Sequence, residues 1–424
     1  MAPTLADVVS LPRMLRTYAS RVRSFTREAR LLLVANTCFA VFAATQNVLA
    51  NLYFTALGFD RTFLGTLIAV NQLAGGLAAF PAAMLLDRIG RRQGAIGGVL
   101  IGTLGWGLAL ASRTEWLILV GEAMAGCGSV LYGLAVVPLL AQASTSRERT
   151  ELFSVSDGLS RLALFAGALL AGAAPAVVAY FAGVPAGSPG AYQAVLLASL
   201  LFRLLGLVPL WLMHDPRPAV EGPLAQPAMR AVSYFDPRVL LRLKTPAFRY
   251  ATPLLIVYFG GALINPFLNV YLKDRFGASD LAIGVVLGSI DLVAGAAILA
   301  GPLVAQSIGR GRAAAWGALL SAAGFAVIGL AGSFAVVAVT IVLRSAVFNM
   351  TLPLYRALVI DRTPDDEVAV VNFVLTTSTN IGPAVAPAIS GWMQDQAGYG
   401  PVFLSAIAAY AAGAAAFRMA VKRA

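Results

Sequence analysis

Six ionisable residues lie inside long apolar stretches of this 424-residue chain, where a charged side chain lacks water to hydrate it. Three are acids and three are bases: Glu122, Asp157, Arg161, Arg203, Asp291 and Arg344. Charges inside a membrane-spanning helix are costly, and they mark ion pairs, proton relays or binding sites. Because the six charges sum to zero, pairing is one interpretation. Asp157 and Arg161 are four residues apart, the spacing of an ion pair on one helix.

Asp291 is the first candidate for proton exchange. It lies between Gly288 and Gly295, deep in an apolar stretch, with no basic residue within a helical turn. Removal from water penalises the charged form of a carboxylate, so such a group can gain and lose a proton as its surroundings change. An ion pair with Arg344 is the alternative interpretation, and both remain open.

Glu122 is the second candidate for proton exchange. It begins the pattern Glu122-x-x-x-Gly126-x-Gly128, in which the glycines permit close helix packing. Its carboxylate can exchange a proton, bind a cationic substrate, or neutralise Arg161 or Arg203. The sequence does not choose among these roles.

A motif of two asparagines and a tyrosine occurs twice, 218 positions apart. Its copies are Asn47-x-x-x-Asn51-x-Tyr53 and Asn265-x-x-x-Asn269-x-Tyr271. The four-residue spacing puts both amides of a copy on one helical face. Polar side chains in lipid need partners, so these faces should turn inward. They either line a cavity or hold neighbouring helices together.

A second repeated segment supports two related halves. Ile89-Gly90-Arg91 recurs as Ile308-Gly309-Arg310, 219 positions later, and one residue inserted in a loop accounts for the change of offset. At this offset Gln72 matches Asp291, so both halves carry a polar residue at the same depth. Gln72 therefore joins the candidate cavity residues.

The elements that must position these residues are membrane-spanning helices. The chain is 59% hydrophobic and 12% charged, about half the charge of a soluble protein. Its apolar runs are long enough to cross a hydrocarbon layer of about 30 Å, and they are continuous rather than alternating, which excludes a β-barrel. Twelve runs are predicted, at 31–57, 62–86, 93–112, 115–143, 151–182, 190–213, 247–272, 280–305, 313–332, 334–360, 367–393 and 399–420.

A short charged loop separates the second run from the third. Its sequence is Ala83-x-x-x-Asp87-Arg88-x-Gly90-Arg91-Arg92. This resembles the signature loop of major facilitator superfamily transporters, which usually have Gly in place of Ala83. The resemblance implies an all-α polytopic membrane protein with twelve transmembrane helices in two six-helix bundles and substrate between them near the midplane. It also implies that Asp87, Arg88, Gly90, Arg91 and Arg92 form a gating latch, which the second half lacks because Gln306 and Ser307 replace the first two.

Four segments follow from composition and from this resemblance. Residues 1–30 form a basic amphipathic segment on the membrane surface, without the apolar core of a signal peptide. Residues 31–213 form the first bundle and 247–424 the second. Between them, residues 214–246 contain six Pro and five Lys or Arg, as expected of a cytoplasmic linker.

The net charge of +11 follows the predicted topology. With both termini in the cytoplasm, only Arg61, Arg113, Lys273 and Arg275 fall on loops of the opposite side. A basic bias of this kind orients a plasma or inner membrane protein. It also attracts anionic lipid headgroups, so nucleic acid is not an expected partner. A monomer is expected.

Ion or substrate gradients are the expected energy source, because the sequence has no nucleotide-binding loop, metal-ligand cluster or catalytic triad. No enzyme activity, cofactor or metal is therefore predicted. We predict a secondary active transporter of a small organic or amphiphilic solute, working by alternating access and coupled to protons, with efflux-type antiport favoured. Alternatives are a lipid flippase or organic-anion carrier and, outside transport, a membrane sensor or scaffold or an intramembrane enzyme. Proton coupling is expected at Asp291 and Glu122, and the cavity at Asn47, Asn51, Gln72, Asn265, Asn269, Arg161 and Arg344.

Overall fold

The computed structural model describes residues 25–144, 148–214, 246–364 and 367–422. Most of the predicted N-terminal segment and of the predicted linker therefore lies outside the described residues. The last residues of that N-terminal segment belong to the first long helix, which begins at Arg27 after its N-cap Thr26. The Thr26 hydroxyl accepts a hydrogen bond from the Ala29 backbone N–H and so satisfies one free donor of the first turn.

The described residues form helices of membrane-spanning length, as predicted. The first half contains α2 (Arg27–Ala56), α3 (Arg61–Ile89), α4 (Arg91–Ala111), α5 (Glu115–Gln142), α6 (Arg149–Ala182), α7 (Pro189–Leu205) and α8 (Leu207–Leu212). The second half contains α11 (Pro246–Ile264), η3 (Asn265–Phe267), α12 (Leu268–Phe276), α13 (Asp280–Ile308), α14 (Arg310–Leu330), α15 (Phe334–Asp361), α16 (Val368–Ala397) and α17 (Tyr399–Lys422). Counting α7 with α8, and α11 with η3 and α12, gives the twelve predicted spans.

Two spans that the sequence presents as continuous are broken. The sixth is interrupted at Gly206, between α7 and α8. The seventh passes through a short 3-10 turn that contains Pro266. Proline has no backbone N–H to donate and disturbs the preceding turn of a helix, so the break follows its position. It lies between Asn265 and Asn269, the two amides of the second motif.

Eleven of the spans combine length with strongly apolar composition. The exception in the described chain is α16, which is 30 residues long but contains the polar run Thr376-Thr377-Ser378-Thr379-Asn380. Its length and its packing against α3 and α11 still make it part of the bundle.

The two halves repeat each other closely. Helices α3 and α13 are both 29 residues long, α4 and α14 are both 21, and α5 and α15 are both 28. Each of these pairs is offset by 219 positions. Gly90 and Gly309 have φ of 87° and 83°, a conformation that favours glycine, so both short loops turn in the same way. The internal repeat predicted from sequence is confirmed.

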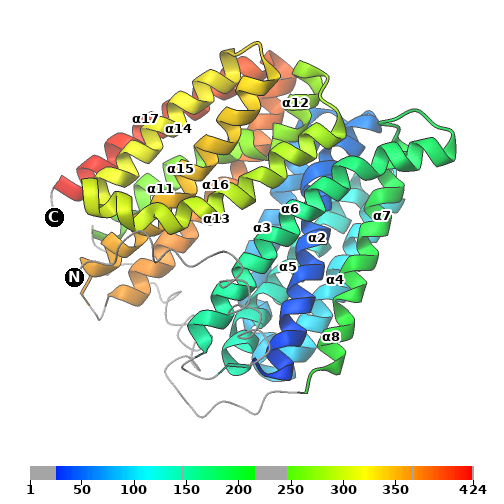
Figure 1. Cartoon of the computed structure of the whole chain (residues 1–424), viewed down its shortest axis with the longest axis horizontal. Coiled ribbons are helices and arrows are strands. Elements are labelled where there is room, and N and C mark those ends of the chain that lie inside the picture. Colours follow the sequence, from blue (N-terminus) through cyan, green and yellow to red (C-terminus); the bar gives the residue numbers. More distant parts are fainter. Residues whose placement is uncertain (1–24, 145–147, 215–245, 365–366, 423–424) are drawn as a thin grey trace, which may run out of the picture.

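Figure 1 shows the two bundles meeting at one end, beside α12, and diverging toward the other. Helices α3 and α16 form one large contact between the halves and α6 and α13 form another, while α2 also contacts α12 and α13. We call the end with Ile89, Gln142 and Leu212 the linker face, since the chain there enters residues 215–245. The end with Ala56, Ala111 and Ala182 is the far face.

Candidate substrate site

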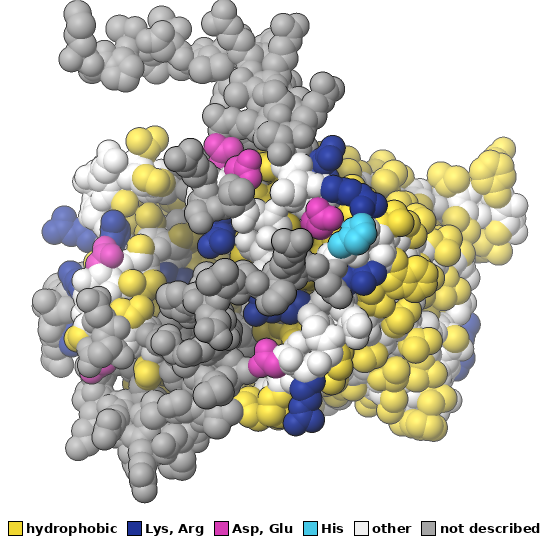
Figure 2. All heavy atoms as spheres, turned by 90° about the horizontal axis from the view of Figure 1, so that it is seen from below, with side chains coloured by type: hydrophobic (Ala, Val, Ile, Leu, Met, Phe, Trp, Pro, Cys, Tyr) yellow, Lys and Arg dark blue, Asp and Glu magenta, His cyan; other side chains and the backbone are white. Residues whose placement is uncertain are grey.

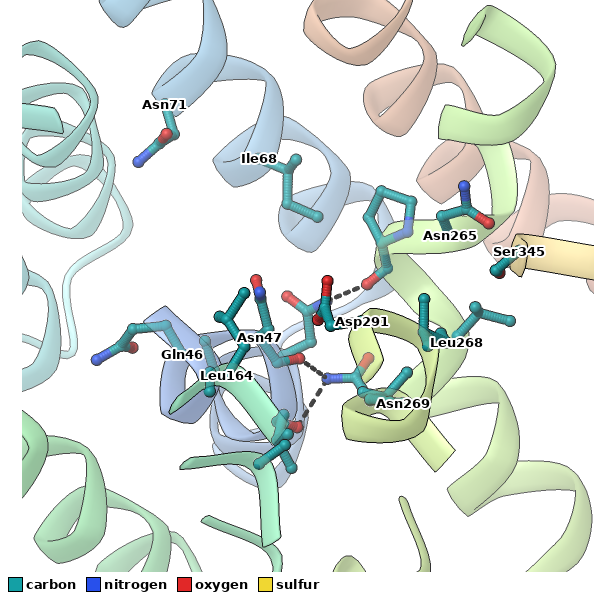
Figure 3. A pocket seen from close by; sticks show the side chains of 18 of the residues that line it. Gln46, Asn47, Ile68, Asn71, Leu164, Asn265, Leu268, Asn269, Asp291 and Ser345 are labelled. Carbon is teal, nitrogen blue, oxygen red and sulfur yellow. Dashed lines mark hydrogen bonds between the residues drawn. The ribbon is translucent and has the colours of Figure 1, made fainter. Parts of the chain in front are cut away.

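A cavity of about 620 Å³ lies between the two halves. Figure 3 shows Asn47, Asn71, Asn265, Asn269 and Asp291 around it, from helices of both halves. Its amide and charged side chains are mostly carboxamides, with two acids and one base: Gln46, Asn47, Asn51, Asn71, Gln72, Glu122, Asn265, Asn269, Asp291, Arg344 and Asn349. The volume is that of a site for a small organic molecule, and the amides offer both donors and acceptors to a polar ligand.

Two asparagines close the cavity toward the far face by reciprocal hydrogen bonds. Asn51 Nδ2 of α2 donates to the Pro266 carbonyl, at 2.6 Å. Asn269 Nδ2 of α12 donates to the Val48 carbonyl, at 2.9 Å. The two donors are 218 positions apart, and so are the two acceptors. Each half therefore donates the same hydrogen bond to the other half. We call this pair of bonds the amide clasp. The sequence left open whether these asparagines line a cavity or hold neighbouring helices together. Asn51 and Asn269 do both.

Glycines let the halves approach closely between the clasp and the far face. A Cβ at Gly65 of α3 would lie 2.2 Å from the Pro387 carbonyl oxygen of α16. At the equivalent crossing, a Cβ at Gly284 of α13 would lie 2.3 Å from the Ala168 carbonyl oxygen of α6. Any side chain at these positions would force the helices apart. Gly391 against Arg61 and Gly172 against Asp280 repeat the arrangement nearer the helix ends.

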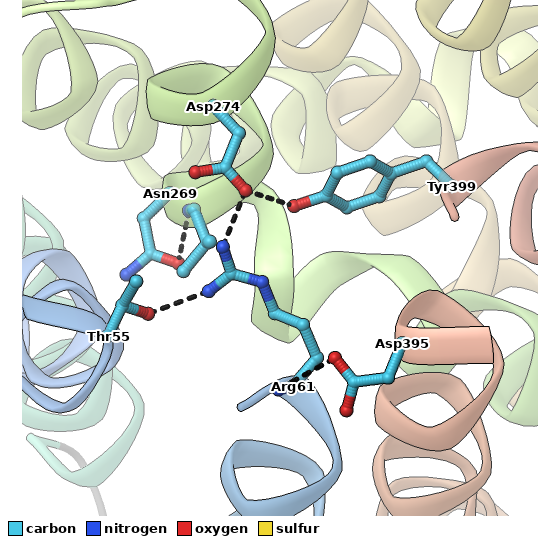
Figure 4. Close-up of polar contacts among 7 residues, drawn as sticks. Thr55, Arg61, Asn269, Asp274, Asp395 and Tyr399 are labelled. Carbon is cyan, nitrogen blue, oxygen red and sulfur yellow. Dashed lines mark hydrogen bonds and ion pairs between the residues drawn. The ribbon is translucent and has the colours of Figure 1, made fainter. Parts of the chain in front are cut away.

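Charged groups join the halves at the far face itself (Figure 4). Arg61 Nη2 of the first half pairs with Asp274 of the second at 2.6 Å, and the Tyr399 hydroxyl donates to the same carboxylate at 2.9 Å. Asp395 of α16 accepts the backbone N–H groups of Arg61 and Thr62, at 3.1 and 2.7 Å. A carboxylate is stabilised there by the positive end of α3.

A second polar group at the far face joins α7 to α13. The Tyr192 hydroxyl donates to Asp280 at 3.0 Å, and Lys273 pairs with the same carboxylate. The inter-half contacts described so far lie between the cavity and the far face, whereas the bundles diverge toward the linker face. Figure 2, which looks onto the linker face, shows Lys and Arg side chains spread over it.

Asp291 of α13 is half-buried in the cavity wall. In the described part of the chain it forms no ion pair with Arg344. Arg161 of α6 acts on Asp291 electrostatically, and its side chain packs against Gly295, one turn further along α13. Arg161 itself pairs with Asp157, Nε to Oδ2, at 3.0 Å. The predicted helical pair of Asp157 and Arg161 is confirmed, and Arg161 is not among the cavity-lining residues.

Glu122 of α5 is only 2% exposed and belongs to the cavity wall. Its Oε2 accepts a hydrogen bond from Asn71 Nδ2 at 2.8 Å, whereas Oε1 has no partner among the described residues. It forms no salt bridge with Arg161 or Arg203 there. Arg203, also buried, lies within the first bundle with its guanidinium 4.8 Å from the Phe42 ring centre.

Arg344 of α15 is the buried base of the cavity wall and is 5% exposed. Its Nη2 donates to Asn265 Oδ1 at 2.9 Å and to Ser345 Oγ at 3.2 Å. The guanidinium carbon lies 4.2 Å from the Phe325 ring centre, a favourable cation–π distance. Nε and Nη1 have no partner with hydrogen-bond geometry within the described chain, although the Tyr410 hydroxyl interacts with the guanidinium group.

The cavity contains most of the residues singled out from sequence, and three amides that sequence reasoning missed. Asn47, Asn51, Gln72, Glu122, Asn265, Asn269, Asp291 and Arg344 all line it. The missed residues are Gln46, Asn71 and Asn349. Gln46 and Asn71 each precede a residue that was selected, so adjacent polar residues inside an apolar run were the available signal. Among described residues no group of three or more His, Cys, Asp or Glu is placed to hold a metal ion.

The predicted gating loop lies at the linker face, outside the cavity. Asp87 and Arg88 are exposed, and Gly90 provides the positive φ of the turn. Arg92 donates to the carbonyls of Leu210 and Trp211 at 2.9 and 2.7 Å, which ties the loop to the end of α8. The latch role of this loop remains a prediction.

Two six-helix halves around one shared polar cavity define the architecture of a membrane transport protein. The chain matches the sequence profile of the Major Facilitator Superfamily over residues 31–289 and 251–424, and it belongs to that family.

Similar proteins agree with this fold. The nucleoside transporter NupG superposes with a TM-score of 0.74 at 15% identity, covering 94% of this chain and 100% of that one. A bacterial homologue of the human lysosomal transporter Spinster, in an inward-facing and unoccupied conformation, gives a TM-score of 0.70 at 16% identity, covering 95% of each chain. The inner membrane transport protein YajR of Escherichia coli K12 is 29% identical over 106 residues, which span 24% of this chain and 23% of that protein.

Proposed function

We propose that this protein is a secondary active transporter that carries a small polar solute across a cell membrane by alternating access. The observation that supports this most directly is the cavity of about 620 Å³ between the halves, closed toward the far face by the amide clasp and the glycine crossings. Those contacts are symmetric and join two bundles of six helices each, so they can separate when the bundles move as rigid bodies.

We further propose that transport is coupled to protons through Asp291, with Glu122 as the second candidate. Asp291 is a half-buried acid in the wall of the cavity that would hold the solute. A proton and a solute that occupy one site in turn are exchanged rather than carried together. We therefore propose efflux-type antiport as the direction.

The proposed orientation places the linker face in the cytoplasm, because most basic residues fall on that side. In this orientation the contacts that close the cavity lie on the outer side, and the bundles diverge toward the cytoplasm. The cavity would then load solute from inside the cell, as efflux requires.

The replacement Asp291→Asn tests the coupling. Purified protein is first screened for solutes that raise its melting temperature at two pH values, and the best solute is used in proteoliposomes. The neutral amide should abolish transport driven by a pH gradient but retain exchange of labelled for unlabelled solute, since exchange moves no net proton.

The matched control is Asp157→Asn. Asp157 is an exposed acid on α6, the helix that packs against α13, and it does not line the cavity. It should keep both activities. If Asp291→Asn retains the wild-type response to the pH gradient, Asp291 is not the coupling residue and Glu122 replaces it. If the wild-type protein exchanges no solute, the transport function itself is wrong.

A further inference from the structure

Two buried charged side chains, one in each half, have polar atoms left without a partner at the cavity wall. They are Glu122 of α5, through Oε1, and Arg344 of α15, through Nε and Nη1. Both side chains are more than nine-tenths buried and both belong to the wall of the same cavity. Buried polar atoms of this kind normally have partners, so those that lack one in the described protein point to a ligand.

The fold does not require either charge. At the offset of 219 positions, Glu122 corresponds to Ile341 and Arg344 corresponds to Ala125. Ile341 and Ala125 are fully buried in the equivalent helices α15 and α5. Each half therefore packs an alkyl side chain where the other half places its charge, and the charges need an explanation other than packing.

An amide from a neighbouring element holds each charged group on one side. Asn71 of α3 donates to Glu122 Oε2, and Asn265 of η3 accepts from Arg344 Nη2. The remaining oxygen of Glu122 is an acceptor for an ammonium or another N–H donor. The remaining nitrogens of Arg344 are donors for a carboxylate or another oxygen acceptor.

The two groups lie at comparable depth and do not neutralise each other. Glu122 is seven residues after the start of α5, and Arg344 is ten residues after the start of α15. Both helices start at the far face, so the two positions differ by about one helical turn. No ion pair joins them in the described structure, and each helix belongs to a different bundle. A ligand between them would be held by both halves.

We propose that Glu122 and Arg344 are the two ends of one recognition site whose ligand is a small zwitterion with a protonated amine and a carboxylate. The amine binds Glu122 Oε1, the carboxylate binds Arg344, and the cavity amides take the remaining polar groups. A zwitterion satisfies both buried charges at once, whereas an organic cation or anion would leave one of them without a counter-charge. This assignment rests on the proposed transport function and specifies its substrate class.

The test uses the purified full-length protein in detergent and measures affinity from the concentration dependence of its melting temperature. The probes are the common amino acids and a set of dipeptides, each compared with its N-acetyl and C-terminal amide derivatives. We expect at least one zwitterion to stabilise the protein. Both of its blocked derivatives should bind about tenfold or more weakly, since each loses a charge-assisted hydrogen bond.

Variants assign each end of the ligand. In Glu122→Gln, the zwitterion and its N-acetyl derivative should bind with equal affinity. In Arg344→Gln, the zwitterion and its C-terminal amide should bind with equal affinity. Arg344→Lys should restore the preference for the free carboxylate. Arg203→Gln removes another buried arginine, one that does not line the cavity, and should leave the preferences unchanged.

The results separate this assignment from the coupling mechanism. Asp291→Asn should keep the preference for a zwitterion even where it abolishes transport driven by a pH gradient. The proposal is wrong if the protein prefers a cation, an anion or a neutral solute such as a nucleoside. It is also wrong if no zwitterion of the panel binds, or if Glu122→Gln and Arg344→Gln leave the preferences as in the wild type.

Discussion

Removal of one arm of the amide clasp should open the far face. Asn269 is 2% exposed, and its Nδ2 donates to the carbonyls of Val48 and Asn47 at 2.9 and 3.3 Å. A buried hydrogen bond contributes about 0.5–1.5 kcal/mol net, so Asn269→Leu should cost the closed state about 1–2 kcal/mol. This corresponds to a shift of about 5–30-fold in the equilibrium between the closed and the open far face.

The ion pair at the same face should matter less. Arg61 and Asp274 have side chains that are 17% and 36% exposed, and exposed pairs contribute about 0–1 kcal/mol. Asp274→Asn should therefore shift the equilibrium less than Asn269→Leu does, although the pair joins the same two halves.

Distances between spin labels can measure both shifts. Arg113→Cys and Gly332→Cys put labels on equivalent exposed positions of the far face, once Cys38 and Cys127 have been replaced. Asn269→Leu should add a population with a longer distance. Asn47→Leu is the matched control, since the Asn47 side chain forms no hydrogen bond with any described residue. An unchanged distance distribution for Asn269→Leu, or a larger effect of Asp274→Asn, would refute the reasoning.

Two other predictions concern packing and topology. Gly65→Ala should also lengthen the far-face distance, because the new Cβ would overlap a carbonyl of α16. Gly76→Ala should not, because a Cβ at Gly76 would face open space. Equal distributions for the two variants would contradict the close-packing argument. For topology, a cysteine at Ser188 of the far face should react with an impermeant thiol reagent in intact cells, and one at Ala225, within the predicted linker, should not. The reverse labelling would overturn the proposed orientation.

Local patterns predicted the helices well, since a span is specified by its own composition. The apolar runs gave the spans within a few residues, and Gly90 and Gly309 end helices where the charged loops were expected. The breaks at Gly206 and Pro266 were not predicted, although glycine and proline are known to interrupt helices. A helix with either residue often stays continuous, and packing against other helices decides the outcome.

Contacts between elements were predicted only where one helix contains both partners. Asp157 and Arg161 are four residues apart on α6, so their pairing followed from helix geometry. The same geometry did not reveal that Arg161 packs against Gly295 of α13 and not into the cavity. Spacing shows which residues share a face of a helix, but not which helix that face meets. Likewise, the four-residue spacing within each asparagine motif predicted inward faces but did not reveal the reciprocal clasp of Asn51 and Asn269.

The internal repeat also limits how the linker face can close. The halves of this family are related by an axis along the membrane normal, so each contact and its copy lie at the same face. The repeat therefore supplies each far-face contact twice, as with Gly65 and Gly284 or with Asn51 and Asn269. These contacts contribute nothing at the linker face.

Closure of the linker face must come from other residues, and there the halves differ. The first half has Asp87 and Arg88 in its charged loop, whereas the second has Gln306 and Ser307 at the equivalent positions. A lock built from this loop cannot be symmetric, because its copy in the second half has Gln306 in place of the acid. The far face is thus held in part by uncharged contacts that the repeat provides twice, the amide clasp and the glycine crossings. We propose that closure of the linker face uses this single charged loop, which would make it the more sensitive of the two to salt and to substitution of one residue.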